Sequence, residues 1–327
     1  SLFPDFFIGS CTDFVNGQWS CLIQLVLFTL TLPVGILGNL IVLVYYTCFG
    51  KSLSTSDVFL LNLTVCDSAW ILTLPLIIYF KYQQPQDSRA FCQIKNLSFN
   101  FNIYGSILFL TLISFDRYVG TVHPISSLRW WNVDKAKICS VCAWIWLIFS
   151  IAPDFFANFS ILSSDNITVC LNHINGPLVS NKTITTVRTA VYFLIPFCVM
   201  MAFYTKTIGV LRRLPKGSRT KGVRQAGRKP QQLIVAAILV FAVSFVPYHI
   251  LVIAQVFKRT PDLINPTNTN LLYSSYELCE AVCTLSSCLD PVLYCLTSEQ
   301  VKRKLLDLKT NRYRRMCCRT SRRVGVE

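Results

Sequence analysis

Long apolar runs separated by shorter polar segments make up most of the chain. Seven runs recur, at residues 22–47, 57–80, 91–115, 137–156, 187–211, 232–257 and 271–296. A helix of about 20 residues crosses a hydrocarbon core of about 30 Å, so each run is long enough to span a membrane. Because a helix satisfies its own backbone hydrogen bonds in lipid, the pattern predicts an all-α membrane protein, a seven-transmembrane helix bundle.

The segments on either side of the bundle divide the chain into three parts. We expect a short extracellular N-terminus at 1–21, the bundle at 22–296 and a cytoplasmic tail at 297–327. Around the start of the tail Leu296, Val301, Leu305 and Leu308 recur at helical spacing, while Lys and Arg fill the other face. This alternation predicts a short amphipathic helix that lies on the membrane surface after the seventh span.

Composition and charge agree with a membrane protein and fix its orientation. Of the 327 residues, 53% are hydrophobic and only 14% are charged, and the net charge is +15. With the N-terminus outside, 24 of the 31 lysines and arginines lie on the cytoplasmic side. This positive-inside asymmetry predicts a multi-pass plasma-membrane protein whose basic face meets anionic lipid or a cytoplasmic partner. It argues against nucleic acid as the partner.

External segments carry sites for covalent modification. Cys92 and Cys170 both face the oxidising side, so we expect a disulfide between them. Cys11 and Cys21 are also external, and their pairing stays open. Three glycosylation sequons fall between the fourth and fifth spans, at Asn158, Asn166 and Asn181. On the other side of the membrane, two cysteines in the basic tail are palmitoylation candidates, Cys317 and Cys318.

Ionisable residues at membrane depth are costly, which makes each of them a functional hypothesis. Asp67 lies within the second span and Asp290 near the end of the seventh, with Ser106 and Ser286 at similar depth. Two carboxylates with nearby hydroxyls predict a site for a small cation such as sodium. The alternative is a pair of protonated or water-bridged acids that only pack the helices. No other cofactor is expected.

Each of the seven spans carries one distinctive motif. The stretches "GILGNL", "LNLTVCD" and "DRY" mark the first three spans, and Trp144 marks the fourth. Pro196 followed by Tyr204 marks the fifth, "FAVSFVP" the sixth and "DPVLY" the seventh. Seven motifs in this order resemble those of the rhodopsin-like (class A) G-protein-coupled receptors. The resemblance implies a receptor rather than an enzyme, with an extracellular ligand, a heterotrimeric G protein, arrestin, a receptor kinase and membrane lipid as partners.

The resemblance also implies a switch at the cytoplasmic ends of the helices. In such receptors the arginine corresponding to Arg117 is held by its neighbour, here Asp116, and by the sixth helix. When the sixth helix swings out, the arginine meets the G protein. The expected coupling and switch residues are Asp116, Arg117, Tyr118, Tyr204 and Tyr294.

Details within the motifs are similar to the purinergic branch, whose relatives include lipid-mediator and protease-activated receptors. The expected ligand pocket departs from that branch, because Glu277 and Glu280 stand where a glutamine and an arginine are usual. Two carboxylates would repel a polyphosphate. They would instead receive a cationic ligand or a peptide amine, or pair internally with Arg188, Lys95 or Lys258. The other pocket candidates are Phe99, Asn100, Tyr104, Arg188, Tyr248 and His249.

Other interpretations stay open at this point. A protease-activated type of receptor would use the N-terminal "SLFPDF" as a tethered ligand, and a lipid or carboxylate receptor is a further alternative. A membrane transporter is the competing class, but inverted repeats and discontinuous helices are not evident. The residues name neither the ligand nor the G-protein class.

Overall fold

The computed structural model describes residues 19–49, 53–83, 89–161, 178–213, 237–254 and 266–297, and almost all of them are helical. The helices are α1 (Trp19–Val44), α2 (Thr55–Gln83), α3 (Arg89–Val122), α4 (Pro124–Trp130), α5 (Val133–Ile161), α6 (Leu178–Arg188), α7 (Ile195–Arg213) and α9 (Pro266–Thr297). A further helix occupies Ala237–Ala254. Two π-helical turns, η2 (Tyr45–Phe49) and η3 (Thr189–Leu194), continue α1 and connect α6 to α7.

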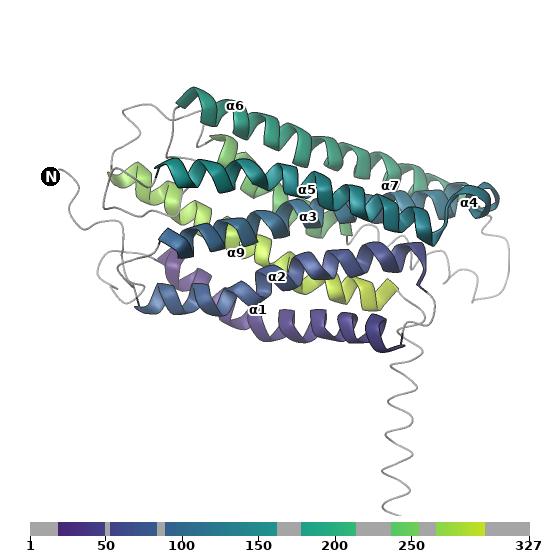
Figure 1. Cartoon of the computed structure of the whole chain (residues 1–327), viewed down its shortest axis with the longest axis horizontal. Helices are drawn as coiled ribbons and strands as arrows, with labels where there is room; N and C mark the ends of the chain where they lie inside the picture. Colours follow the sequence, from purple (N-terminus) through teal and green to yellow (C-terminus); the bar gives the residue numbers. More distant parts are fainter. Residues whose placement is uncertain are drawn as a thin grey trace, which may run out of the picture.

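The long helices lie side by side along one axis and form a single bundle (Figure 1). Six helical stretches are long and apolar enough to cross a membrane, and they match the first six apolar runs. The seventh run is α9, which is less apolar because it carries Glu277, Glu280 and Asp290. The predicted all-α, seven-helix bundle is therefore confirmed. The expected amphipathic helix in the tail lies outside the described residues.

Residue polarity around the helices is inverted relative to a soluble protein. The outer surface carries apolar side chains such as Leu30, Leu72 and Phe149, each more than 60% exposed, as expected for contact with lipid. Buried polar side chains, among them Asp67, Asn102 and Ser287, face inward. The inner faces therefore hold both the apolar core and the candidate chemistry.

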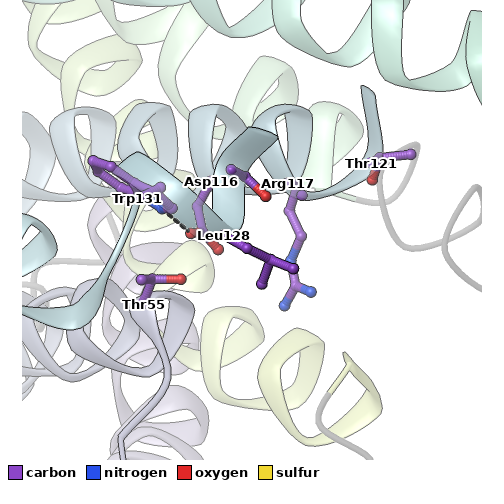
Figure 2. Close-up of a pocket in the computed structure, with 8 residues that line it drawn as sticks. Thr55, Asp116, Arg117, Thr121, Leu128 and Trp131 are labelled. Atoms are coloured by element: carbon purple, nitrogen blue, oxygen red, sulfur yellow. Dashed lines mark hydrogen bonds between the residues drawn. The ribbon is translucent and has the colours of Figure 1, made fainter. Parts of the chain in front are cut away.

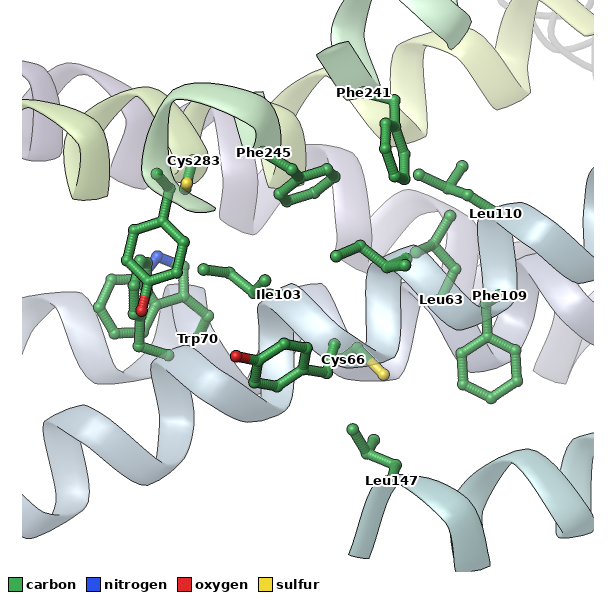
Figure 3. Packing of buried hydrophobic residues seen from close by; sticks show 14 of the residues in the cluster. Leu63, Cys66, Trp70, Ile103, Phe109, Leu110, Leu147, Phe241, Phe245 and Cys283 are labelled. Atoms are coloured by element: carbon green, nitrogen blue, oxygen red, sulfur yellow. The ribbon is translucent and has the colours of Figure 1, made fainter. Parts of the chain in front are cut away.

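The apolar core fills the middle of the bundle between α2, α3, α5 and the helix at 237–254 (Figure 3). Leu63, Ile103, Phe241 and Phe245 are all almost fully buried there. The helices α2 and α3 approach closely at Gly105, where an added Cβ would lie 2.5 Å from Cys66 Sγ. Glycine at this position therefore sets how near the two helices come, as small residues do in membrane helix packing.

One irregularity in the helices lies next to a proline. The turn η3 ends at Leu194, two residues before Pro196. Proline donates no backbone hydrogen bond, and a π-helical turn is one way for a helix to accommodate the loss. The motif residue Pro196 thus has a local irregularity in the backbone beside it.

Candidate functional site

The inward-facing polar residues form three groups along the bundle. One group lies at the end where α3 begins, which we call the Lys95 end. A second lies at mid-depth around Asp67. The third lies at the opposite end, where α3 finishes and α4 begins, which we call the Arg117 end (Figure 1). Each group is described in turn.

At the Lys95 end, a buried ion pair joins α3 to α9. Lys95 Nζ lies 2.9 Å from Glu280 Oε2, and the two side chains are 9% and 0% exposed. Gln24 Nε2 of α1 donates to the same oxygen at 2.7 Å. The sequence left three internal partners open for the acids. In the structure, Lys95 forms an ion pair with Glu280. The charge of Glu280 is balanced inside the protein.

The second acid, Glu277, lies one turn nearer the end of the bundle. Ser20 Oγ of α1 donates to its Oε2 at 3.0 Å, and the residue is only 2% exposed. Together with the bond from Gln24 to Glu280, this contact ties α1 to α9 at two successive turns. Since α1 is part of the polar network, it has a role at this end beyond packing against lipid.

Aromatic rings from four helices surround this end of the bundle. Phe99 packs on Trp70 and Tyr248, with ring centroids 5.0 Å and 5.4 Å away. Tyr104 lies beneath the guanidinium of Arg188, whose Cζ is 5.8 Å from the ring centroid. Trp70, which donates to Thr284 Oγ1 at 3.0 Å, was missed by the sequence analysis. Its place one turn after Asp67 in "LNLTVCDSAW" was the available signal.

His249 connects the aromatic rings to the backbone. Its ring stacks on Phe193 at a centroid distance of 4.0 Å and an interplanar angle of 8°. Its Nδ1 lies 2.8 Å from the Phe245 carbonyl oxygen, and since that oxygen can only accept, Nδ1 carries the proton. The structure thus buries all eight expected pocket residues at this end: Phe99, Asn100, Tyr104, Arg188, Tyr248, His249, Glu277 and Glu280.

At mid-depth the polar residues converge on Asp67. Asn102 Nδ2 donates to Asp67 Oδ1 and to Ser287 Oγ, both at 3.0 Å, and Ser106 Oγ reaches Asp67 Oδ1 at 3.4 Å. Ser286, which the sequence favoured, instead donates to the Cys283 carbonyl oxygen at 2.6 Å. Ser287 takes its place because adjacent positions on a helix point about 100° apart. Asn102 was not anticipated.

Several buried oxygens in this region lack a hydrogen-bond partner among the described residues. They are Asp67 Oδ2, Asn102 Oδ1, Asn39 Oδ1 and both carboxylate oxygens of Asp290. Asp290 lies within electrostatic range of Asp67. An all-oxygen set with two carboxylates suits a hard cation such as sodium rather than a soft metal. The residues present therefore fit the expected ion.

At the Arg117 end the expected contact between Asp116 and Arg117 is absent. Asp116 accepts a hydrogen bond from Ser56 Oγ. It accepts a second one, at 2.8 Å, from Trp131 Nε1 (Figure 2). Arg117 forms no ion pair with any acid in the described part of the chain. The prediction that Asp116 holds Arg117 was therefore wrong for this structure. The physical reason is that both carboxylate oxygens of Asp116 already accept hydrogen bonds, from Ser56 and Trp131.

A cavity of about 340 Å³ opens beside these residues. Its walls include Thr55, Arg117, Gly120, Leu128 and Trp131. Figure 2 shows the guanidinium of Arg117 on the far side of Leu128 from the Asp116–Trp131 hydrogen bond. The cation is thus presented to a cavity rather than neutralised by its neighbour.

The structure describes the side chains of two of the three tyrosines in the expected switch. The Tyr118 hydroxyl lies 3.2 Å from His123 Nε2, and its ring packs on Phe203 of α7 at 5.1 Å. Tyr204 is almost fully buried. Tyr294 belongs to α9, but its side chain lies outside the described residues. Two of the three therefore have defined positions at this end.

The modification sites predicted from sequence cannot be placed in the same way. Cys92, Asn158 and Asn181 belong to helices, but their side chains lie outside the described part of the structure. The other sites lie outside the described chain altogether: Cys11, Cys170, Asn166, Cys317 and Cys318. They, and the side chain of Cys21, stay predictions.

Comparison with known proteins decides the family. The family model described as "7 transmembrane receptor (rhodopsin family)" matches residues 38–294. The chain belongs to the rhodopsin family of seven-transmembrane receptors. This family membership confirms the resemblance seen in the motifs, and it makes the protein a multi-pass membrane receptor that takes an extracellular ligand and couples to G proteins.

Curated relatives give the receptor a purinoceptor-like character. It is 29% identical to purinoceptor 1 of Cavia porcellus over 279 residues, which are 83% of this chain and 73% of the relative. It is 30% identical to purinoceptor 2 of Mus musculus over 281 residues, 84% of this chain and 74% of the relative. Purinoceptor 1 of Homo sapiens is 28% identical over 284 residues, 85% and 74% of the two chains.

The buried ion pair at the Lys95 end yields a stability prediction. Lys95→Met should destabilise the receptor by about 3–5 kcal/mol, because it leaves Glu280 charged and buried without its cation. The double variant Lys95→Met with Glu280→Leu should recover most of the loss, since it removes both charges. Thermal unfolding of the detergent-solubilised receptor measures both effects. Equal melting temperatures for Lys95→Met and the parent would contradict the ion pair.

Proposed function

We propose that the receptor binds its ligand at the Lys95 end, outside the cell, and couples to G proteins at the Arg117 end, inside. The orientation is supported by the distribution of basic residues, which concentrate in the segments that follow the Arg117 end of the bundle. The observation that carries the coupling is the Arg117 side chain, which has no acidic partner in the described chain and lines a cavity there. Movement of the helix at 237–254 would widen this cavity for the G protein.

We infer that the ligand differs in charge from a nucleotide polyphosphate. The relatives are named purinoceptors, but here the cation Lys95 is neutralised by Glu280, and Glu277 adds a second acid beside it. With Lys95 neutralised by Glu280, the remaining acid Glu277 would repel phosphates and favour a cationic group or a peptide amine. The alternatives are a tethered N-terminal ligand that proteolysis exposes, and a lipid or carboxylate ligand held by Arg188.

A ligand screen on cells that express the full chain tests this proposal. Nucleotides, lysolipids, carboxylates and cationic peptides are compared by the G-protein nucleotide exchange that they stimulate. We expect cationic peptides or amines to act, with Glu277→Gln lowering their potency about tenfold, as for a lost charge-assisted contact. Activation by a nucleoside triphosphate, with unchanged potency in Glu277→Gln, would contradict the proposed cationic ligand. It would leave the proposed G-protein coupling intact.

The cytoplasmic assignment gives a separate prediction. Arg117→Ala should abolish agonist-stimulated or basal nucleotide exchange on every G-protein class that the parent activates, while surface expression stays close to normal. Arg129→Ala is the matched control, since Arg129 lies nearby in the last turn of α4 and does not line the cavity. Normal exchange by Arg117→Ala would remove Arg117 from the coupling site.

We further propose that sodium occupies the mid-depth group around Asp67 and Asp290. Support comes from the buried oxygens that lack hydrogen-bond partners among the described residues and from the two neighbouring carboxylates, whose charges a cation would balance. The ion would hold the second, third and seventh spans together in one arrangement and so favour the inactive receptor.

Sodium binding predicts an ion-specific stabilisation. At 100 times the dissociation constant a ligand stabilises by about 2.7 kcal/mol, so sodium chloride should raise the melting temperature by several degrees more than choline chloride. Asp67→Asn should lose this difference. Asp57→Asn, at the start of α2 and bonded to Tyr46, should keep it. An equal effect of both salts on the parent would exclude the site.

The remaining partners and modifications follow from family and sequence. We propose arrestin, a receptor kinase and membrane lipid as partners at the cytoplasmic side. A disulfide between Cys92 and Cys170, glycans at the three external sequons and acylation of Cys317 and Cys318 complete the proposal.

A further inference from the structure

Among the described residues, two donate hydrogen bonds to the carboxylate of Asp116, and neither of them is Arg117. Ser56 Oγ, from the first turn of α2, donates to Oδ2, and Trp131 Nε1 donates to Oδ1 at 2.8 Å. Asp116 is only 7% exposed, so it depends on protein donors rather than on water. Each of its oxygens therefore has a hydrogen bond within the bundle.

The indole of Trp131 is held in place from two sides. Its ring stacks on Phe59 of α2 at 6.2 Å, with an interplanar angle of 27°. Phe115 of α3 meets it edge-on at 5.1 Å and 90°. Because two rings fix the plane of the indole, the direction of its N–H toward Asp116 is set by packing and not only by the hydrogen bond.

Trp131 also connects Asp116 to α4. The Trp131 backbone N–H donates to the Ser127 carbonyl oxygen at 2.8 Å and closes the C-terminal end of this helix. The helix exposes Ile125 and Leu128, which are 83% and 85% accessible. A change in the position of α4 is therefore transmitted to the donor that holds Asp116.

These contacts determine which group is available to capture Arg117. An aspartate bound by two donors gains less from a guanidinium than a bare one, because its oxygens are already partly satisfied. We propose that Trp131, together with Ser56, is a positioning residue that withholds Asp116 from Arg117 and so keeps the guanidinium ready for the G protein. The inference rests on the G-protein coupling proposed above for the Arg117 end.

The alternative is that Trp131 only packs the α2–α3–α4 corner and satisfies a buried acid. The two roles differ in one respect. A positioning role acts through the charge of Asp116, so it disappears when Asp116 cannot capture Arg117. A packing role is independent of that charge.

The test uses the full chain with four variants, Trp131→Phe, Ser56→Ala, Asp116→Asn and the double variant Trp131→Phe with Asp116→Asn. Trp131→Phe keeps an aromatic ring between Phe59 and Phe115 but deletes the N–H. The matched control is Trp130→Phe on α4, whose ring packs on Phe115 and Trp131. The readout is the affinity of each solubilised receptor for nucleotide-free heterotrimers, one from each α-subunit class, without agonist.

We expect Trp131→Phe and Ser56→Ala each to weaken G-protein binding, on the order of three- to tenfold, the scale of a hydrogen bond to a charged group. Trp130→Phe should match the parent. In the Asp116→Asn background, Trp131→Phe should have no further effect, since asparagine cannot form the competing ion pair.

Three results would overturn the inference: parent-like or tighter binding by Trp131→Phe, the same loss from Trp131→Phe in the Asp116→Asn background, or parent-like binding by Ser56→Ala. The last result decides the case if Trp131→Phe fails to fold. If no heterotrimer binds the parent or any variant, G-protein coupling itself fails and the inference falls with it.

Discussion

Every charge inside this bundle must find its partner within the protein, because lipid surrounds the helices and offers no hydrogen bonds. That constraint accounts for the three inward polar groups. Glu280 is matched by Lys95 and Gln24, Asp116 by Ser56 and Trp131, and the apolar core between them separates the two ends. Asp67, Asp290 and Glu280 each keep at least one carboxylate oxygen that no described residue satisfies, but of the three acids Glu280 alone has a cation beside it in the described chain. A bound cation, as proposed above, would balance the charges of Asp67 and Asp290.

The distribution of partners explains how a purinoceptor-like frame can hold a different pocket. The family pattern depends on the core and on residues such as Asn39 and Asp67, which do not touch the Lys95 end. Glu280 enters that frame without an uncompensated charge because Lys95 and Gln24 lie opposite it. The proposed change of ligand chemistry at the Lys95 end would therefore require no change at the Arg117 end.

The sequence was sufficient for features that depend on local pattern. Apolar runs located the spans, and motif order identified the family, because both are read along one stretch of chain. It was insufficient to predict contacts that depend on which face of a helix a residue occupies, or on segments that are distant in the chain. Adjacent Ser286 and Ser287 differ in which one faces Asn102, and adjacency in the chain did not bring Asp116 and Arg117 together.

The sequence was equally insufficient to predict contacts between residues that lie far apart in the chain. Three cations were candidates for the acids of α9, and only the fold selects Lys95, which lies on a helix far from Glu280 in the chain. Trp131 gave no signal at all, since it lies just after α4, where apolar periodicity is broken. Its significance depends on Phe59 and Phe115, which come from two other helices.

The close approach at Gly105 has a consequence for motion. With Cys66 Sγ seated where a side chain would be, α2 and α3 touch too intimately to slide without a steric barrier. The pair then serves as a fixed reference frame, and rearrangement falls to helices with looser borders or irregular backbone, such as the segment around η3. Lys95 and Arg117 both lie on α3, so in the proposed mechanism a signal would cross the membrane through other helices that move past α3.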